Sequence, residues 1–203
     1  MSKKQTRQSK RLSWLLRHGA PEAGLAMDPA GWMSVAEVLR YLGMSRGDLD
    51  EVVRTNNKRR IQVEGARVRC CQGHSTASGV SAEALEASWR PYAGEALVWH
   101  GTAVDAVASI AEEGIKPQAR THVHLAPATG SVVGKRAQVE VMLGADPGLM
   151  AAAGEPIFVA QNGVILARRV PASCVVEIRA MTAYARTKER ELGGLFPGAR
   201  RSA

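Results

Sequence analysis

Apolar residues near the start of the chain recur every three or four positions, which is the spacing of one helix face. Leucines in this register predict a first helix over residues 7–18, and Gly19 and Pro21 are expected to end it. Two further apolar stripes begin after Ser34 and Ser45. Each of these serines is followed three residues later by an acidic residue, the capping-box pattern that opens a helix. The first part of the chain therefore predicts three helices.

Short alternating runs follow the third predicted helix. Residues 61–63 and 66–70 flank a Glu-Gly pair and predict a β-hairpin. Three helices followed by a hairpin, in a segment rich in Lys and Arg, is typical of a winged-helix-like plan. Residues 76–95 are rich in Ser, Gly, Pro and Glu and resemble a linker with one or two helical turns.

The second half of the chain has mainly the pattern of β-structure. Asn162-Gly163 lies between two apolar runs and predicts a hairpin. Thr102 is expected to cap a short helix, and Asp146-Pro147 to open another. Strands are predicted at 97–99, at 174–178, and as a half-buried strand through 139–143. We expect an α+β fold with a winged-helix-like lobe over 1–92, a mainly β lobe over 93–182, and a frayed polar tail over 183–203.

Charge changes this picture by indicating a polyanionic partner. The formal net charge is +8 and the pI about 9.9. No acidic residue precedes Glu22, whereas the same stretch holds a run of basic residues that ends at Arg17. A second basic cluster over 54–69 has only Glu64 as a counterweight. Most of these side chains are expected to be a solvated face, but Arg17, Arg69 and Arg120 are embedded in otherwise apolar or Gly-rich blocks.

Several classes of protein are disfavoured. No apolar run of eighteen residues is present, so no membrane span is predicted, and the basic N-terminus lacks the apolar core of a secretory signal. We expect a cytoplasmic protein, with its three cysteines reduced. Cys70, Cys71 and His74 lie too close together for a zinc site, and the His122–His124 pair has no acidic residue nearby, so no metal is expected.

The five histidines gather in short blocks that also contain Gly or Arg: L-L-R-H-G (15–19), R-C-C-Q-G-H-S (69–75), W-H-G-T (99–102) and R-T-H-V-H-L (120–125). Such clustering favours one composite site. Arginine grips phosphate with paired hydrogen bonds, and imidazole exchanges a proton near neutral pH. For Arg17-His18 taken alone, a helix end that favours cations is the better explanation. For W-H-G-T, a strand-to-helix junction is the alternative, and Gly101 would otherwise let a ligand approach the backbone.

Other nucleotide-binding and hydrolase motifs are missing. The chain has no G-x-G-x-x-G fingerprint and no G-x-S-x-G elbow.

The order of its blocks resembles the KptA family of RNA 2′-phosphotransferases. The resemblance spans about residues 9–178, and its motifs are S-K-R-L-S-W-L-L-R-H (9–18), G-L-A-M-D-P-A-G-W-M-S-V-A-E-V-L (24–39), the three central blocks named above, V-G-K-R (133–136), Q-N-G-V (161–164) and R-R-V-P (168–171).

This resemblance implies an N-terminal winged-helix-like lobe and a C-terminal ADP-ribosyltransferase-like lobe. It also implies that an internal RNA 2′-phosphate attacks NAD and expels nicotinamide, giving an ADP-ribosylated RNA. A ribose hydroxyl then attacks the phosphorus, releasing 2′-OH RNA and ADP-ribose 1″,2″-cyclic phosphate. The family's catalytic positions are matched to Arg17, His18, Arg69 and Arg120. Its NAD-binding positions are matched to His100, Gly101, Thr102 and His124, with Val159 as the hydrophobic member of the signature.

Further expectations concern ligands and partners. Gln72 and His74 either line the phosphate pocket or pack their own loop. NAD is expected as a co-substrate without any metal, and RNA as the partner of a monomeric enzyme. Trp99 stands where Tyr is commoner in the family. This departure affects the expected secondary contacts to NAD and leaves the expected reaction class unchanged.

Two other functions stay open. The chain could transfer ADP-ribose to nucleic-acid ends, or it could be a winged-helix nucleic-acid-binding module without turnover. Persistent attachment of ADP-ribose would indicate the first, and salt-dependent binding without turnover of NAD would indicate the second.

Overall fold

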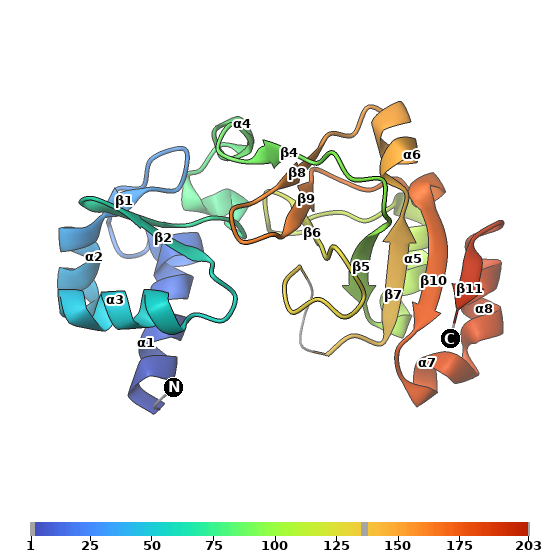
Figure 1. The fold of residues 1–203 in the computed structure, drawn as a ribbon, viewed down its shortest axis with the longest axis horizontal. Helices are drawn as coiled ribbons and strands as arrows, with labels where there is room; N and C mark the ends of the chain where they lie inside the picture. Colours follow the sequence, from blue (N-terminus) through green and yellow to red (C-terminus); the bar gives the residue numbers. More distant parts are fainter. Residues whose placement is uncertain (1–2, 135–137, 203) are drawn as a thin grey trace. The chain divides into compact units, whose positions relative to one another are not determined.

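The computed structural model describes residues 3–134 and 138–202. The expected V-G-K-R motif therefore lies partly outside the described residues. The fold is α+β, as predicted, with helices and three small sheets (Figure 1). The chain divides into two compact units. The first comprises residues up to Trp89 together with Ala119–Thr121, and the second comprises Arg90–Gln118 and the residues from His122 onward.

The first unit combines helices with a three-stranded antiparallel sheet of order β1-β3-β2. Its elements are α1 (Lys3–Trp14), η1 (Leu15–Gly19), β1 (Met33–Ser34), α2 (Val35–Leu42), α3 (Arg46–Thr55), β2 (Ile61–Glu64), β3 (Arg67–Cys70), η2 (Thr76–Ser78) and α4 (Ala82–Glu86). The three predicted helices and the hairpin are confirmed. The first helix begins earlier than expected, and its last turn, η1, is a π-helix.

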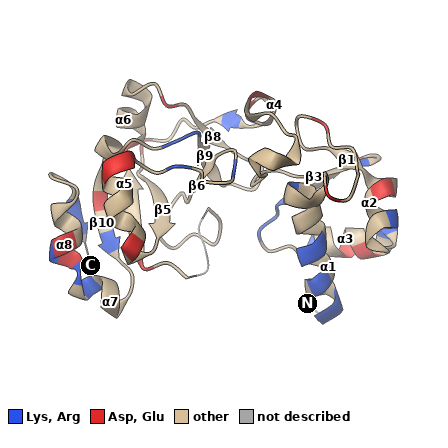
Figure 2. Cartoon of the chain, turned by 180° about the vertical axis from the view of Figure 1, so that it is seen from behind, with Lys and Arg blue, Asp and Glu red and all other residues tan. Residues whose placement is uncertain are grey.

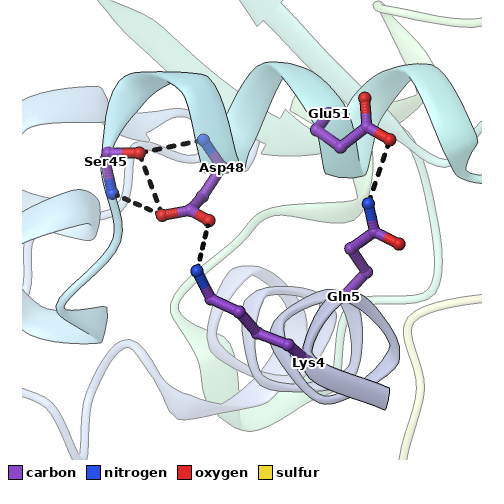
Figure 3. A network of polar contacts seen from close by, with 5 residues as sticks. All are labelled: Lys4, Gln5, Ser45, Asp48 and Glu51. Carbon is purple, nitrogen blue, oxygen red and sulfur yellow. Dashed lines mark hydrogen bonds and ion pairs between the residues drawn. The ribbon is translucent and has the colours of Figure 1, made fainter. Parts of the chain in front are cut away.

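Helix ends and polar contacts explain how α1 and α3 are held. Ser45 and Asp48 form the predicted capping box, with both reciprocal hydrogen bonds present (Figure 3). Asp48 also accepts from Lys4 Nζ of α1 at 3.1 Å, and Glu51 accepts from Gln5 at 3.0 Å. Beneath these contacts, fully buried leucines of α1 and η1 pack with the apolar faces of α2 and α3.

The second unit contains two four-stranded sheets, of order β11-β10-β7-β5 and β4-β8-β9-β6. Its strands are β4 (Arg90–Pro91), β5 (Val98–Thr102), β6 (Val123–Leu125), β7 (Val141–Ala145), β8 (Ile157–Val159), β9 (Ile165–Ala167), β10 (Val175–Ala180) and β11 (Arg200–Ser202). Its helices are η3 (Val104–Ala106), α5 (Val107–Glu113), α6 (Pro147–Ala152), η4 (Ala172–Cys174), α7 (Ala183–Thr187) and α8 (Glu189–Gly194). Figure 1 shows β5, β7 and β10 side by side, and apolar residues of α5 join the core beneath them.

Three sequence predictions for this unit are wrong. Thr102 does not cap a helix; it is the last residue of β5, and the Glu140 carboxylate instead accepts from the backbone NH of Val104 at 2.9 Å. β7 begins at Val141 and is buried along its whole length, because Val141, Leu143 and Ala145 join the main core while Met142 packs with Trp99 and Ala126 in a second cluster. The strands predicted at 97–99 and 174–178 and the Asn162-Gly163 hairpin are confirmed as β5, β10 and β8–β9, apart from their ends, whereas β4 and β11 were not predicted.

The third correction concerns the tail. Residues 183–202 are not frayed, because they form α7, α8 and β11. Ala185, Leu192 and Phe196 are buried in the core of the second unit, and β11 pairs in parallel with β10. Among the described residues, no helix has the length and apolar character that crossing a membrane would require.

Candidate active site

The π-turn η1 carries the first two candidate residues, Arg17 and His18. Leu15 and Leu16 of the same turn are fully buried and anchor it to the core, while Arg17 and His18 are half-buried. A π-turn widens the helix by one residue per hydrogen-bonded ring and is frequent at functional sites. The burial of the two leucines therefore leaves the next two side chains at the edge of the core.

The loop after β3 holds Arg17 in place. Arg17 Nε donates to the carbonyl of Gly73 at 2.9 Å, and the backbone NH of Ser75 donates to the carbonyl of Arg17 at 3.0 Å. Gly73 has a φ of +88°, and a Cβ at this position would lie 2.9 Å from Arg17 Nε. Both the backbone conformation and the close approach therefore require glycine here.

Arg120 joins the same unit through the short segment Ala119–Thr121. The backbone NH of Thr76 donates to the carbonyl of Ala119 at 3.1 Å, and that of Thr121 donates to the carbonyl of His74 at 3.1 Å. Between these two hydrogen bonds, Arg120 pairs with Ser75 in an isolated β-bridge. The segment thus brings Arg120 to the loop that holds Arg17, although the two are more than a hundred positions apart in the sequence.

A cavity of about 290 Å³ opens beside Arg17 and His18, and it reveals a residue that the sequence analysis missed. It is lined by Ser9, Lys10, Ser13, Trp14, Arg17, His18 and Arg60. Arg60 Nε is buried and makes no hydrogen bond, while the Arg60 carbonyl accepts from the backbone NH of Cys71 at 2.8 Å. This guanidinium nitrogen has no protein acceptor and is available to donate to a bound anion. The basic run over 58–60 was the only signal in the sequence, and the overall basicity of 54–69 concealed it.

The electrostatics of this site favour an anion. Burial lowers the pKa of Arg17, and the charges of Arg120 and Arg60 lower it further. Burial also lowers the pKa of His18, with contributions from Arg17 and Arg120. The pKa of Lys58 is lowered by burial and then by Arg60 and Arg17. Since no Asp or Glu lines the cavity, these cationic groups repel one another, and a bound polyanion would relieve that repulsion.

Arg69 does not line this cavity. Its side chain is 4% exposed, its Nε donates to Gln62 at 2.8 Å, and its Nη1 donates to the carbonyl of Ala30 at 3.0 Å. The guanidinium also stacks on Trp32, 4.3 Å from the ring centroid. Through these contacts Arg69 links β3 to β2 and to the loop before β1.

Gln72 and His74 are also buried, and neither lines the cavity. His74 is 0% exposed, and neither ring nitrogen makes a hydrogen bond. Burial lowers its pKa to about 3. Its ring lies against Gly31, where a Cβ would come within 2.5 Å of Nε2. Both side chains therefore lie inside the packed loop, away from the cavity that Arg17 and His18 line.

The four predicted NAD-binding residues lie together in the second unit. His100, Gly101 and Thr102 are on β5 and His124 is on β6, and all four are half-buried. His100 Nδ1 lies 3.3 Å from the carbonyl of His124. Gly101 does not leave open space for a ligand on its Cβ side, because a Cβ there would meet the Val139 side chain at 2.7 Å.

The remaining site expectations concern Val159 and metal ligands. Val159 ends β8 and is half-buried, pairing with Ile165 of β9. Within the described part of the chain, no group of three or more His, Cys, Asp or Glu side chains is arranged to hold a metal ion.

Comparison with known proteins decides the family. A family model described as RNA 2′-phosphotransferase, Tpt1 / KptA family, matches residues 3–169. The chain belongs to the Tpt1/KptA family of RNA 2′-phosphotransferases. Its relatives include a probable RNA 2′-phosphotransferase from Burkholderia lata, 40% identical over 85% of this chain and 91% of the relative. Proteins of the same description from Streptomyces griseus and Pseudomonas syringae are each 38% identical, over 80% and 88% of this chain and 91% and 97% of the relatives.

Membership in the Tpt1/KptA family covers both units. The matched range contains the cationic cavity of the first unit and the histidine pair of the second. A phosphotransferase must hold a highly charged phosphate group. The acid-free lining around Arg17, His18 and Arg60 has the chemistry for that task.

Proposed function

We propose that this protein is an NAD-dependent RNA 2′-phosphotransferase. It transfers an internal RNA 2′-phosphate to the ADP-ribose part of NAD and releases nicotinamide, RNA with a free 2′-OH, and ADP-ribose 1″,2″-cyclic phosphate. The observation that carries the proposal is the cavity in which Arg17, His18 and Arg60 meet without a carboxylate, in a chain of the Tpt1/KptA family.

Three arginines are assigned to the RNA 2′-phosphate: Arg17 and Arg60, which line the cavity, and Arg120, which does not line it but lies on the segment paired with the loop that holds Arg17. Each guanidinium keeps its charge at any working pH and donates in a planar fork that matches phosphate oxygens. The Arg60 Nε without a partner would gain a charge-assisted hydrogen bond, and mutual repulsion within the cluster would fall on binding. The same groups would stabilise the additional charge of a crowded phosphorus during transfer. Arg69 is assigned to positioning, because its guanidinium is already engaged.

His18 is assigned the movement of a proton. Its lowered pKa keeps the imidazole neutral at neutral pH, so that it can accept a proton. In the second step a ribose hydroxyl loses its proton as its oxygen bonds to phosphorus, and the RNA 2′-oxygen needs a proton as its bond to phosphorus breaks. We assign both transfers to His18, which takes the proton from the attacking oxygen and returns it to the leaving one. A dianionic phosphate is already nucleophilic, so the first step needs no base.

The second unit is assigned to NAD. The chemistry of its side chains fits: His100 and His124 lie on neighbouring strands with half-buried rings, and the Thr102 hydroxyl is nearby on the same strand as His100. NAD would supply the ribose carbon that the RNA phosphate attacks, the nicotinamide that leaves, and the ADP-ribose that carries the phosphate away. We further propose that this unit is ADP-ribosyltransferase-like and that the first is winged-helix-like, in line with its helices and β2–β3 hairpin.

The experiment uses an oligoribonucleotide with one internal 2′-phosphate, incubated with the full chain, with and without NAD, and without added metal. Complete conversion to the 2′-OH product only in the presence of NAD, together with ADP-ribose cyclic phosphate, is expected. Arg60→Ala should abolish conversion, and Arg40→Ala, which removes an exposed arginine of the same unit, should not. RNA that keeps ADP-ribose attached would instead indicate an ADP-ribosyltransferase, and binding without consumption of NAD would indicate a binding module.

A further inference from the structure

The cavity extends beyond Arg17 and His18 along α1, and its lining follows two rows at helical spacing. Ser9, Ser13 and Arg17 form one row, and Lys10, Trp14 and His18 form the other. Residues four apart lie one above the other on an α-helix, so that Ser9 and Ser13, and Lys10 and Trp14, follow the axis of α1, and the π-turn adds Arg17 and His18 at its end. At about 1.5 Å per residue the rows span roughly 12 Å, and phosphates of a stacked strand rise by about 3.4 Å each. The lining is thus long enough for several nucleotides.

Volume supports the same conclusion. The cavity has a volume of about 290 Å³. A phosphate group has only five heavy atoms and would fill a part of it. The remaining space lies next to an aromatic ring and hydroxyl groups, which are side chains that contact bases and sugars.

Trp14 is an exposed aromatic residue whose ring packs against a glycine. Its side chain is 40% exposed. Its ring lies against Gly19, where an added Cβ would be only 2.4 Å from two ring atoms. The π-turn between the two residues produces this approach, because it places residues five apart over one another. A ring fixed in this way loses little freedom on binding and is a suitable platform for stacking.

Charge identifies the ligand as a polyanion. Helix α1 has no acidic residue, and Figure 2 shows Lys and Arg along it. Lys4 is engaged with Asp48 of α3, whereas Lys10 lines the cavity. An amine on the cavity wall, one helical turn from an exposed indole ring, fits a strand of alternating phosphates and bases.

We infer that the α1 side of the cavity binds the nucleotides that flank the 2′-phosphate, with a base stacked on Trp14 and a backbone phosphate bound by Lys10. The inference rests on the proposed function, since it takes the same RNA as the substrate. The enzyme would then bind the single-stranded RNA next to the 2′-phosphate. This binding would not depend on base identity, because every base presents a π-face.

The test measures RNA binding by fluorescence anisotropy without NAD, so that no turnover is needed. Two labelled oligoribonucleotides carry the same internal 2′-phosphate, and in one of them the flanking nucleotides are abasic. The wild-type chain should bind the abasic RNA at least about fivefold more weakly, the lower end of what stacking one base contributes. Trp14→Ala should lose this preference, binding both RNAs alike, and Trp14→Phe should retain most of it.

Matched controls separate a cavity contact from general effects. Tyr41→Ala removes an exposed aromatic residue of α2 that does not line the cavity, and it should keep the full preference. Lys10→Ala should reduce the slope of log Kd against log salt concentration by about one. Arg7→Ala removes an equal charge from the same helix outside the cavity lining and should change that slope less. Thermal unfolding of each variant checks that it is folded.

Each outcome decides the inference. A Trp14→Ala variant that is folded and keeps the preference for flanking bases overturns it. A Trp14→Ala variant with a raised KM for NAD and unchanged RNA binding also overturns it, since the cavity would then hold the adenine of NAD. A wild-type chain that does not distinguish RNA with the 2′-phosphate from RNA without it counts against the proposed function instead. A chain that distinguishes these two but ignores flanking bases overturns this inference alone.

Discussion

Two arginines of the first unit should have opposite mutant phenotypes. Arg60 lines the cationic cavity and its Nε has no partner, whereas Arg69 is buried and makes two hydrogen bonds and a stacking contact. Arg60→Ala removes a group whose interactions are made with substrate. Arg69→Ala removes a group whose interactions are made with Gln62, Ala30 and Trp32. We therefore expect the first variant to lose activity and the second to lose stability.

The expected magnitudes follow from these contacts. Removing Arg69 breaks two charged hydrogen bonds and a cation–π contact and leaves the acceptors of Gln62 and Ala30 without a donor. Relief of the buried charge offsets part of this loss, so that about 2–4 kcal/mol of unfolding free energy should be lost. In a unit of this size that lowers Tm by roughly 10 °C or more. Arg60→Ala should change stability by at most about 0.5 kcal/mol. An arginine that stabilises a transferring phosphoryl group contributes about 10³-fold or more to kcat, which is the loss we expect.

The assay combines thermal unfolding with turnover of 2′-phosphorylated RNA, measured below the Tm of both variants. Arg69→Ala should keep at least about a tenth of wild-type kcat at such a temperature, because its contacts are structural. Arg60→Ala with near-normal turnover would refute the assignment of Arg60 to the phosphate. A stable but inactive Arg69→Ala would return Arg69 to the catalytic set that the sequence resemblance implied.

Two histidines give further predictions that depend on pH. Because burial and the charges of Arg17 and Arg120 lower the pKa of His18, NMR titration of the free protein should give a value below 6.5, and Arg120→Gln should raise it; no change on substitution would exclude the proximity of Arg120. His74 has a folded pKa of about 3, so between about pH 6.5 and 3 the unfolded chain binds a proton that the folded chain does not. The free energy of unfolding should therefore fall as pH falls, by about 2 kcal/mol from pH 6.5 to 5. Urea unfolding of His74→Phe should lack this contribution. An equal loss in the wild-type chain and in His74→Phe would contradict the prediction.

Much of the local structure could be predicted from the sequence, because its causes act over a few residues. The capping box at Ser45, the hairpin at Asn162-Gly163 and the apolar stripe of the first helix each depend on neighbours within one or two turns. The Arg17-His18 pair could be singled out for the same reason, since its block is contiguous. Family membership also followed from such blocks, because their order along the chain is a property of the sequence.

Only the tertiary structure decided which arginines line the cavity. Arg60 and Arg69 lie in the same basic stretch and are equivalent by composition, but long-range packing buries one guanidinium against Trp32 and leaves the other facing a cavity. The frayed tail predicted after residue 182 was wrong because its few apolar residues find a core formed by distant strands. Placing Arg120 beside Arg17, and Trp14 over Gly19, likewise required backbone hydrogen bonds and a π-turn that no local pattern specifies.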